Sequence, residues 1–516
     1  MSLLQVVLFF ILCSVALGWV ARRANVPYPI ALVIGGGALG FVPGLPQLEF
    51  DPQFLLVLVL PPILYQAALL TSWRDFKANI ERIGYLAIGL VLVTTLAVGS
   101  ALKLMVPDIP WAVAFTFGAI VSPPDAVAAT AILSRMSIPR RIVTVLEGES
   151  LVNDASGLVL YKFAVAAVLT GAFSIWDASL QFVLVAGGGV VVGLALGWVF
   201  IAVHKRMGDA FVEVLLSLSI PYTAYILAES VHLSGVLAVV AAGVMRGRYT
   251  PEIVSAEMRI LARSVWNIMV FLLNSLIFML IGMALSDVVG RIQGISTAQI
   301  VATSLVVTVV AVAVRFAWVY AVEFTPRAFG LGRGTPPVPG GELFLEGWCG
   351  MRGIVSLAAA LALPVTVQGG AAFPYRDLVI LLTFVVIAVT LVVQGLSMPV
   401  VIRRLRLAKD TSGRDEHRIA REAMGKAALE TIARLAPEEG ASPALAERLR
   451  VEFTERMSAV EQGPEPGTDA AVAKKIRLAA IRAERQELIR VWRESLVSDE
   501  VLHHLEEELD YEESRL

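Results

Sequence analysis

Residues 121–126 read Val-Ser-Pro-Pro-Asp-Ala and lie inside an apolar segment that extends from 110 to 134. Proline lacks a backbone N–H, so two consecutive prolines leave carbonyl groups one turn earlier without a helical partner. At membrane depth such carbonyls persist only where they line a cavity or bind a ligand. The stretch therefore predicts a membrane helix that breaks at Asp125. A simple proline kink, with Asp125 capping the half-helix that follows, is compatible with the same residues.

The composition also indicates a membrane protein. Of 516 residues, 57% are hydrophobic and only 17% are charged, and the mean hydropathy is +0.74. About one residue in nine is charged up to position 409, whereas more than one in three is charged from 410 to 516. We therefore expect a transmembrane domain at 1–408 and a charged, helical, cytoplasmic tail at 409–516.

Several function classes are disfavoured by what the chain lacks. There is no basic stripe for nucleic acid and no phosphate-binding G-x-x-x-x-G-K-[ST] motif. The two cysteines, Cys13 and Cys349, give neither a disulfide framework nor a metal-ligand spacing. The tail has no cysteine and no nucleophile-base spacing. We expect no enzyme activity and no cofactor.

Apolar segments of about 20 residues are long enough to cross a bilayer as helices, and the sequence has thirteen candidates. They lie near 3–21, 28–45, 53–71, 83–106, 110–134, 142–171, 178–203, 210–229, 232–246, 264–286, 298–321, 342–364 and 377–402. The expected fold is an all-α polytopic membrane protein. Because residues 1–5 carry no Lys or Arg, the first segment is interpreted as a retained helix rather than a signal peptide.

The connecting loops predict the orientation. Alternate loops hold 19 basic residues, whereas the other set holds only Arg291 and Arg376. Cytoplasmic loops carry the Lys/Arg excess in membrane proteins. The N-terminus is therefore expected outside and the C-terminus in the cytoplasm.

The segment at 142–171 contains the run Glu-Ser-Leu-Val-Asn-Asp at 149–154. Ser150 and Asp154 are four residues apart and share a helical face, with Asn153 beside them. A charged group at membrane depth is a functional-site candidate. A low-dielectric surrounding disfavours the charged carboxylate, which either a proton or a small hard cation neutralises. Asp154 is therefore expected to bind a small hard cation or a proton, each excluding the other.

The segment at 342–364 supplies a positive charge, Arg352, near its middle. A buried guanidinium requires a partner, and Glu149 is the first choice and Glu346 the second. A purely structural ion pair is the alternative interpretation. Arg315 has no partner that the sequence identifies. Three charged residues nearer the ends of spans are interpreted as structural: Lys162, Glu213 and Glu229.

Together these residues resemble the monovalent cation/proton antiporter superfamily, in the sodium/proton exchanger branch typified by NhaP-like proteins. The resemblance covers about residues 5–405. Its marks, in order along the chain, are Leu-Pro-Pro-Ile-Leu-Tyr at 60–65, the break at 122–125, the run at 149–154, Pro-Tyr at 221–222 through Ser-Gly at 234–235, the stretch 274–282, and Gly-Met-Arg-Gly at 350–353.

The resemblance implies an inverted-repeat fold of thirteen helices with a core domain and a dimerisation domain, a homodimer, and broken fifth and twelfth helices that cross beside the ion site. It implies that Asp154 carries the cation or the proton. Ser150 and the main-chain carbonyl of Pro124 would help ligate the ion. Asn153 would tie the site to the crossing, and Asp125 would stabilise a half-helix end. Asn followed by Asp is the pattern linked to electroneutral exchange.

The chain departs from the family pattern at the crossing and near it. Pro124 replaces the usual threonine, and Ala126 the usual proline, so a hydroxyl ligand is missing although the carbonyl remains. Gln66 stands where the family usually has a glutamate, which leaves one fewer charge for the cation. The preference among sodium, lithium and potassium is therefore left open.

The expected function is secondary active exchange of a cytoplasmic cation, sodium first, for an external proton across the plasma (inner) membrane, in pH and sodium homeostasis. A potassium-preferring or unselective antiporter is one alternative, motivated by Gln66. A non-transporting membrane sensor that signals through its acidic tail is another. In that tail a solvated helical hairpin or bundle is the expected structure, and the opposite-charge spacing over residues 470–509 also suits one long helix.

Overall fold

The computed structural model describes residues 3–23, 28–40, 42, 52–133, 136, 138–171, 175–254, 256–291, 296–328, 337–367, 370–407, 412–458, 468–494 and 499–515. Within these ranges the chain is helical, and the β-structure is limited to an isolated bridge between Thr366 and Ala372. The chain divides into two compact units, residues 1–409 and 410–516. Each is described by itself.

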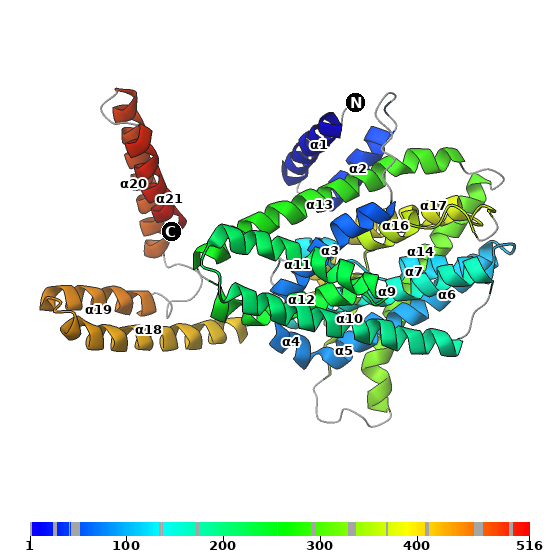
Figure 1. Ribbon diagram of the computed structural model, residues 1–516, viewed down its shortest axis with the longest axis horizontal. Helices are drawn as coiled ribbons and strands as arrows, with labels where there is room; N and C mark the ends of the chain where they lie inside the picture. The colour runs from blue at the N-terminus through cyan, green and yellow to red at the C-terminus, as the bar shows by residue number, and fades with distance from the viewer. Residues whose placement is uncertain are drawn as a thin grey trace. The chain divides into compact units, whose positions relative to one another are not determined.

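The helices of the first unit, shown in Figure 1, are α1 (Leu3–Arg23), α2 (Tyr28–Gly40), α3 (Pro52–Leu70), α4 (Trp73–Ala78), α5 (Ile80–Gly84), the π-helical η1 (Tyr85–Leu90), α6 (Val91–Met105), α7 (Trp111–Val121), α8 (Ala126–Leu133), α9 (Arg140–Thr170), α10 (Ile175–His204), α11 (Ala210–Ser230), α12 (Gly235–Ile253), α13 (Ala256–Arg291), α14 (Thr297–Ala328), α15 (Gly340–Trp348), α16 (Ile354–Leu361) and α17 (Arg376–Leu405).

Each of the thirteen expected segments is helical in the part of the chain that the structure describes. Seven helical stretches there are long and apolar enough to cross a membrane, and three shorter apolar helices accompany them. The all-α membrane fold is thus confirmed, whereas the count of thirteen crossings stays a prediction. A multi-pass protein in a lipid bilayer follows from these stretches.

The two expected breaks are present. α7 ends at Val121 and α8 begins at Ala126, so the break coincides with the Ser-Pro-Pro-Asp run. The twelfth segment breaks in the same way between α15, which ends at Trp348, and α16, which begins at Ile354. Each segment is therefore a pair of half-helices whose ends lie inside the protein.

Glycines allow the long helices to approach each other closely. A Cβ added at Gly282 of α13 would overlap the backbone of Gly37 on α2. A Cβ added at Gly193 of α10 would overlap the carbonyl of Ala238 on α12. Both pairs of helices lie side by side in Figure 1. Small residues at such contacts let helix backbones pack where no hydrophobic effect holds them together.

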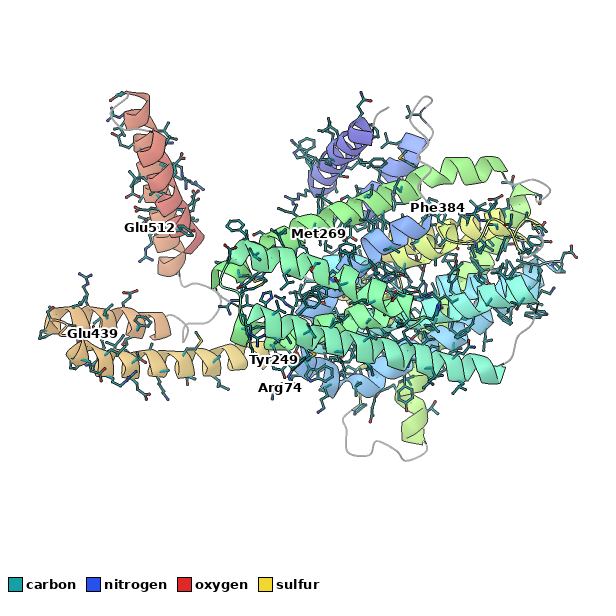
Figure 2. The ribbon with its side chains drawn as sticks, in the orientation of Figure 1. Arg74, Tyr249, Met269, Phe384, Glu439 and Glu512 are labelled. Carbon is teal, nitrogen blue, oxygen red and sulfur yellow. The ribbon has the colours of Figure 1, made fainter. Side chains whose placement is uncertain are left out.

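Burial separates central helices from peripheral ones. The main apolar core includes residues of α7, α9, α16 and α17, and α17 is the most enclosed of the long apolar helices. α10 and α13 keep most of their apolar surface outside, as at Val183, which is 65% exposed. Figure 2 shows Phe384 on α17 and Met269 on α13. The outer helices therefore offer an apolar surface that suits lipid.

The second unit consists of α18 (Ser412–Glu438), α19 (Pro443–Ser458), α20 (Thr468–Arg493) and α21 (Asp499–Arg515). α18 packs on α19, with Glu439 just after the end of α18 (Figure 2), and α20 packs on α21. The tail is therefore built of paired helices, in agreement with the expected hairpin or bundle.

The single helix over 470–509 that the charge spacing also suits is not formed, because α20 ends at Arg493 and α21 starts at Asp499. Arg485 of α20 pairs with Asp510 of α21 at 2.6 Å and with Glu513 at 2.7 Å. The two helices bury three apolar side chains, Ile481, Leu488 and Leu502. Pairing the helices removes this apolar surface from water, which a single extended helix cannot do.

Candidate functional site

The two broken segments meet at their breaks. The backbone N–H of Asp125, just before α8, donates to the carbonyl of Met351 at 2.7 Å. The Asp125 carboxylate lies against Gly353, where an added Cβ would overlap it. Gly353 immediately precedes α16, so a negative charge lies at the N-terminus of that half-helix. Such a position is favourable because the helix dipole is positive at this end.

Arg352 lies at the opposite kind of helix end. Its guanidinium, in a residue that is 1% exposed, donates from Nη1 to the carbonyl of Ser122 at 2.6 Å. Ser122 is the C-cap of α7. The backbone N–H of Arg352 donates to Thr390 Oγ1 at 3.1 Å. The C-terminal carbonyls of a helix carry partial negative charge. Pro123 has no N–H, so the carbonyls at the end of α7 lack helical donors.

The predicted Glu149–Arg352 ion pair is therefore wrong. Glu149 instead binds Arg315 through two hydrogen bonds, of which the Nη2–Oε2 bond is 2.9 Å. Arg315 Nε also donates to the main-chain carbonyl of Glu346 at 3.0 Å. The broken end of α7 supplies the negative partner that Arg352 needs. Glu149 pairs with Arg315, for which the sequence identified no partner.

Glu346, the second choice for Arg352, is also engaged elsewhere. Arg82 of α5 donates to Glu346 Oε2 at 2.6 Å and to Glu323 of α14 at 2.8 Å. The other oxygen of Glu323 accepts from the backbone N–H of Val338 at 3.1 Å. Arg82 is one of the 19 basic residues that the sequence assigns to the alternate loops, and its role in this pairing was not predicted. Its position one residue before the apolar segment at 83–106 was the available signal.

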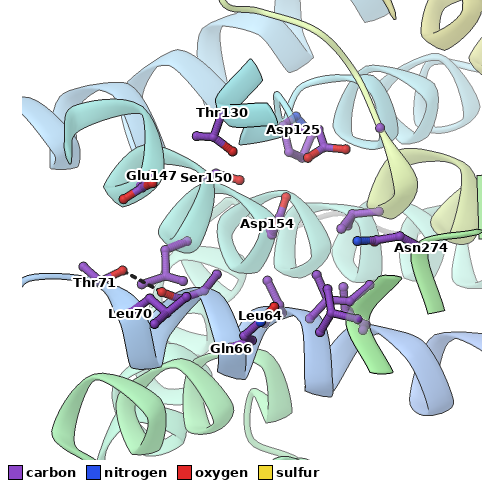
Figure 3. Close-up of a pocket in the computed structure, with 18 of the residues that line it drawn as sticks. Leu64, Gln66, Leu70, Thr71, Asp125, Thr130, Glu147, Ser150, Asp154 and Asn274 are labelled. Carbon is purple, nitrogen blue, oxygen red and sulfur yellow. Dashed lines mark hydrogen bonds between the residues drawn. The ribbon is translucent and has the colours of Figure 1, made fainter. Parts of the chain in front are cut away.

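A cavity of about 400 Å³ lies beside the crossing (Figure 3). Its walls come from α2, α3, α8, α9, α13 and α16 and from the break before α8. The polar residues that line it are Tyr28, Gln66, Thr71, Asp125, Thr130, Glu147, Ser150, Asp154, Asn274 and Ser356. Asp154, which is 6% exposed, and Ser150 share this wall, as their spacing on α9 predicts.

Asn153 connects α9 to the break. Its side-chain amide, fully buried, donates to the carbonyl of Pro124 at 3.3 Å. One turn further, Gly157 lies so close to Pro123 that an added Cβ would overlap its ring. A carbonyl oxygen has two lone pairs, so the Pro124 carbonyl keeps one for a further partner. Ser150 and Asp154 thus line one cavity, and Asn153 links their helix to the carbonyl of Pro124, the third predicted ligand.

Gln66 of α3 also lines the cavity. Its amide donates from Nε2 to Oδ1 of Asn267 on α13 at 3.2 Å. Two neutral amides therefore bridge α3 and α13 in place of the carboxylate that the family pattern leads one to expect. Unlike a glutamate, this pair adds polar groups to the wall without adding charge.

The charged residues interpreted as structural are paired away from this cavity. Lys162 and Glu229 form an ion pair at 2.9 Å. Glu213 lies 3.3 Å from His204 Nε2, which is 2.9 Å from Arg246. None of these residues lines the cavity described above.

A multi-pass helical protein with two crossed half-helix pairs beside a buried carboxylate is, by class, a secondary ion transporter. Residues 7–404 match the family model described as sodium/hydrogen exchanger, transmembrane. The chain belongs to the Na⁺/H⁺ exchanger family, within the monovalent cation/proton antiporter superfamily. The NhaP-like resemblance inferred from its motifs is confirmed.

Relatives that match most of the chain are named as Na⁺/H⁺ exchangers or cation/H⁺ antiporters. An uncharacterized Na⁺/H⁺ exchanger of Mycobacterium tuberculosis is 35% identical over 99% of this chain and 96% of the relative. A sodium, potassium, lithium and rubidium/H⁺ antiporter of Bacillus pumilus is 31% identical over 93% of this chain and 73% of the relative. The sodium proton antiporter MjNhaP1 of Methanocaldococcus jannaschii has the same fold, with a TM-score of 0.63 at 18% identity over 78% of this chain and 99% of its own.

Proposed function

We propose that this antiporter exchanges one cytoplasmic monovalent cation, sodium first, for one external proton, with Asp154 as the ligand that both share. The observation that carries the proposal is the position of Asp154, a nearly buried carboxylate in the wall of the cavity beside the crossing. Its neighbours supply further oxygen atoms, which hard cations prefer. These are the Ser150 hydroxyl and the Pro124 carbonyl.

Competition follows from charge. In a low-dielectric surrounding the ionised carboxylate needs a counter-charge, and either a proton or a monovalent cation provides one. Asn153, the neighbouring residue, is neutral and engaged with Pro124, so it adds no second exchangeable charge. One positive charge then moves in each direction and the exchange is electroneutral.

Asp125 and Arg352 hold charges of opposite sign at the two half-helix ends, so both ends stay compensated while the core moves in an elevator-like way. The protein is a homodimer in the plasma membrane, its C-terminus is cytoplasmic, and it serves pH and sodium homeostasis. Exchange is driven by ion gradients and uses no ATP.

The test is cation-dependent proton movement in everted membrane vesicles, followed with a pH-sensitive dye. The Asp154→Asn variant keeps the shape of the side chain and removes its charge, so exchange should be lost. The matched control is Asp108→Asn, an exposed carboxylate outside the cavity, which should exchange at the normal rate. Retained exchange in a folded Asp154→Asn protein would refute the proposed role.

A broader cation selectivity is the second candidate. The neutral Gln66–Asn267 pair in the cavity wall favours it, because one charge fewer weakens discrimination for the small, strongly hydrated sodium ion. The Bacillus pumilus relative, by its name, exchanges sodium, potassium, lithium and rubidium. Adding each of these ions in turn to the everted vesicles and comparing the dequenching of the pH-sensitive dye separates the two candidate selectivities. A Gln66→Glu variant should narrow the selectivity, and unchanged selectivity would remove the argument.

A further inference from the structure

The cavity extends past Asp154 to a second carboxylate on the same helix. Glu147, Ser150 and Asp154 are spaced i, i+3 and i+7 along α9, so all three lie on one face. All three line the cavity, and Figure 3 shows Glu147 toward one end of it, with Ser150 between Glu147 and Asp154. At 1.5 Å per residue, Glu147 lies about 10 Å along α9 from Asp154.

Glu147 and Asp154 differ in their exposure. Glu147 is exposed, whereas Asp154 is 6% exposed. Arg140, the first residue of α9, is another 10 Å or about two turns beyond Glu147. Glu147 is thus roughly halfway between the end of α9 and Asp154. Glu147 lies at the mouth of the cavity, between Asp154 and the N-terminal end of α9. The loop charges predict that this end of α9 is cytoplasmic.

The charge of Glu147 is available to an ion. Its near neighbour Glu149 is occupied by Arg315 on another face of α9. No described residue forms a hydrogen bond or ion pair with the Glu147 carboxylate, in contrast to Glu149, Glu229, Glu323 and Glu346. The nearby positive charge of Arg140 is itself paired with Asp75 at 3.2 Å.

We propose that Glu147 is an outer cation-binding residue, which captures a hydrated monovalent cation at the cavity mouth and passes it along α9 to Asp154. The inference rests on the proposed function, in which Asp154 is the inner ligand. A carboxylate in a cleft with low-dielectric walls raises the local cation concentration and the rate of capture. Thr130 and Ser150 line the same cavity and offer hydroxyl oxygens along the way.

The experiment measures the apparent KM and the maximal rate of exchange for sodium in proteoliposomes, with sodium presented on one side at a time. Glu147→Gln should raise KM about threefold to tenfold, at an unchanged maximal rate, only on the Glu147 side. Adding an impermeant salt should reduce the difference in KM between Glu147→Gln and the unmodified protein, because salt screens an exposed charge. Glu147→Asp keeps the charge and should retain a nearly normal KM.

The matched control is Glu81→Gln. Glu81 is an exposed glutamate of α5, a helix that packs against α9, and Glu81 does not line the cavity. This variant should leave KM unchanged. An unchanged KM in Glu147→Gln, an equal effect of Glu81→Gln, or an equal shift on both sides would overturn the inference. If the unmodified protein exchanges sodium and Asp154→Asn does not, such a result refutes the role of Glu147 alone. Exchange by Asp154→Asn refutes the proposed function instead.

Discussion

Arg352 donates a hydrogen bond of 2.6 Å to the carbonyl oxygen of Ser122, so the positive charge of one broken segment closes the C-terminal end of the other. The reverse contact joins Asp125 to the start of α16 at Gly353. Two half-helix ends at the crossing, the end of α7 and the start of α16, therefore each receive from the other segment a charge opposite to their own dipole. This reciprocity holds the two breaks together beside Asp154.

Replacing Arg352 should disable the crossing. Arg352→Gln leaves buried carbonyls at the end of α7 without their charged donor, a change that costs on the order of 3 kcal/mol. We expect exchange to fall more than tenfold and the melting temperature of the detergent-solubilised protein to drop. Arg352→Lys keeps the charge and should retain part of the activity. Normal exchange by Arg352→Gln would show that the Ser122 contact is dispensable.

Glu149 and Arg315 should behave as one unit. Removing one partner leaves a buried unpaired charge, so Glu149→Gln or Arg315→Gln should each destabilise the protein by about 3–5 kcal/mol. The double variant leaves no charge unpaired and should be more stable than either single variant. Unfolding of the four proteins in a double-mutant cycle measures the coupling. Additive losses would contradict a direct pair.

Gly157 should tolerate no side chain. An added methyl group would overlap the ring of Pro123, so Gly157→Ala should cost about 1–3 kcal/mol of stability and slow exchange. The matched control is Gly187→Ala on α10, where nothing lies within 4 Å of the added Cβ. That change should be neutral or stabilise by up to about 1 kcal/mol through helix propensity. Thermal unfolding and vesicle exchange compare the two variants, and equal behaviour would refute close packing at Gly157.

The acidic tail should be dispensable for exchange itself. Residues 410–516 form a compact unit of their own, and the cavity residues all belong to residues 1–409. A chain that ends at Lys409 should therefore exchange cations with a normal KM in the vesicle assay. Loss of exchange in a truncated protein that still elutes as a single species would assign the tail an essential role.

The sequence predicted the break in the fifth segment from a local cause. Pro123 and Pro124 remove two backbone donors beside Asp125, and the structure confirms the break between Val121 and Ala126. The prolines do not act alone, because α3 continues through Pro61 and Pro62. The shared face of Ser150 and Asp154 follows from helical periodicity in the same way. These features placed Ser150 and Asp154 on one helical face, and Asp125 at a break, before any packing was known.

The ion-pair partners could not be predicted in this way. Glu149 and Arg315 are 166 positions apart, and Arg352 and Ser122 are 230 apart. Sequence reasoning assigned Glu149 to Arg352 because it matched side-chain charges only. It did not count a helix C-terminus as a negative partner, although the freed carbonyls at the end of α7 act as one.

By itself, the sequence determined the membrane class, the family, the breaks and the helical face that carries Asp154. These depend on composition, on spacing within one segment or on the order of motifs along the chain. Only the tertiary structure decided which charges meet, which carbonyl of the break Asn153 binds, and that Glu147 shares a cavity with Asp154. These relationships depend on how helices from distant parts of the chain pack, and helical periodicity carries no information about the packing partner.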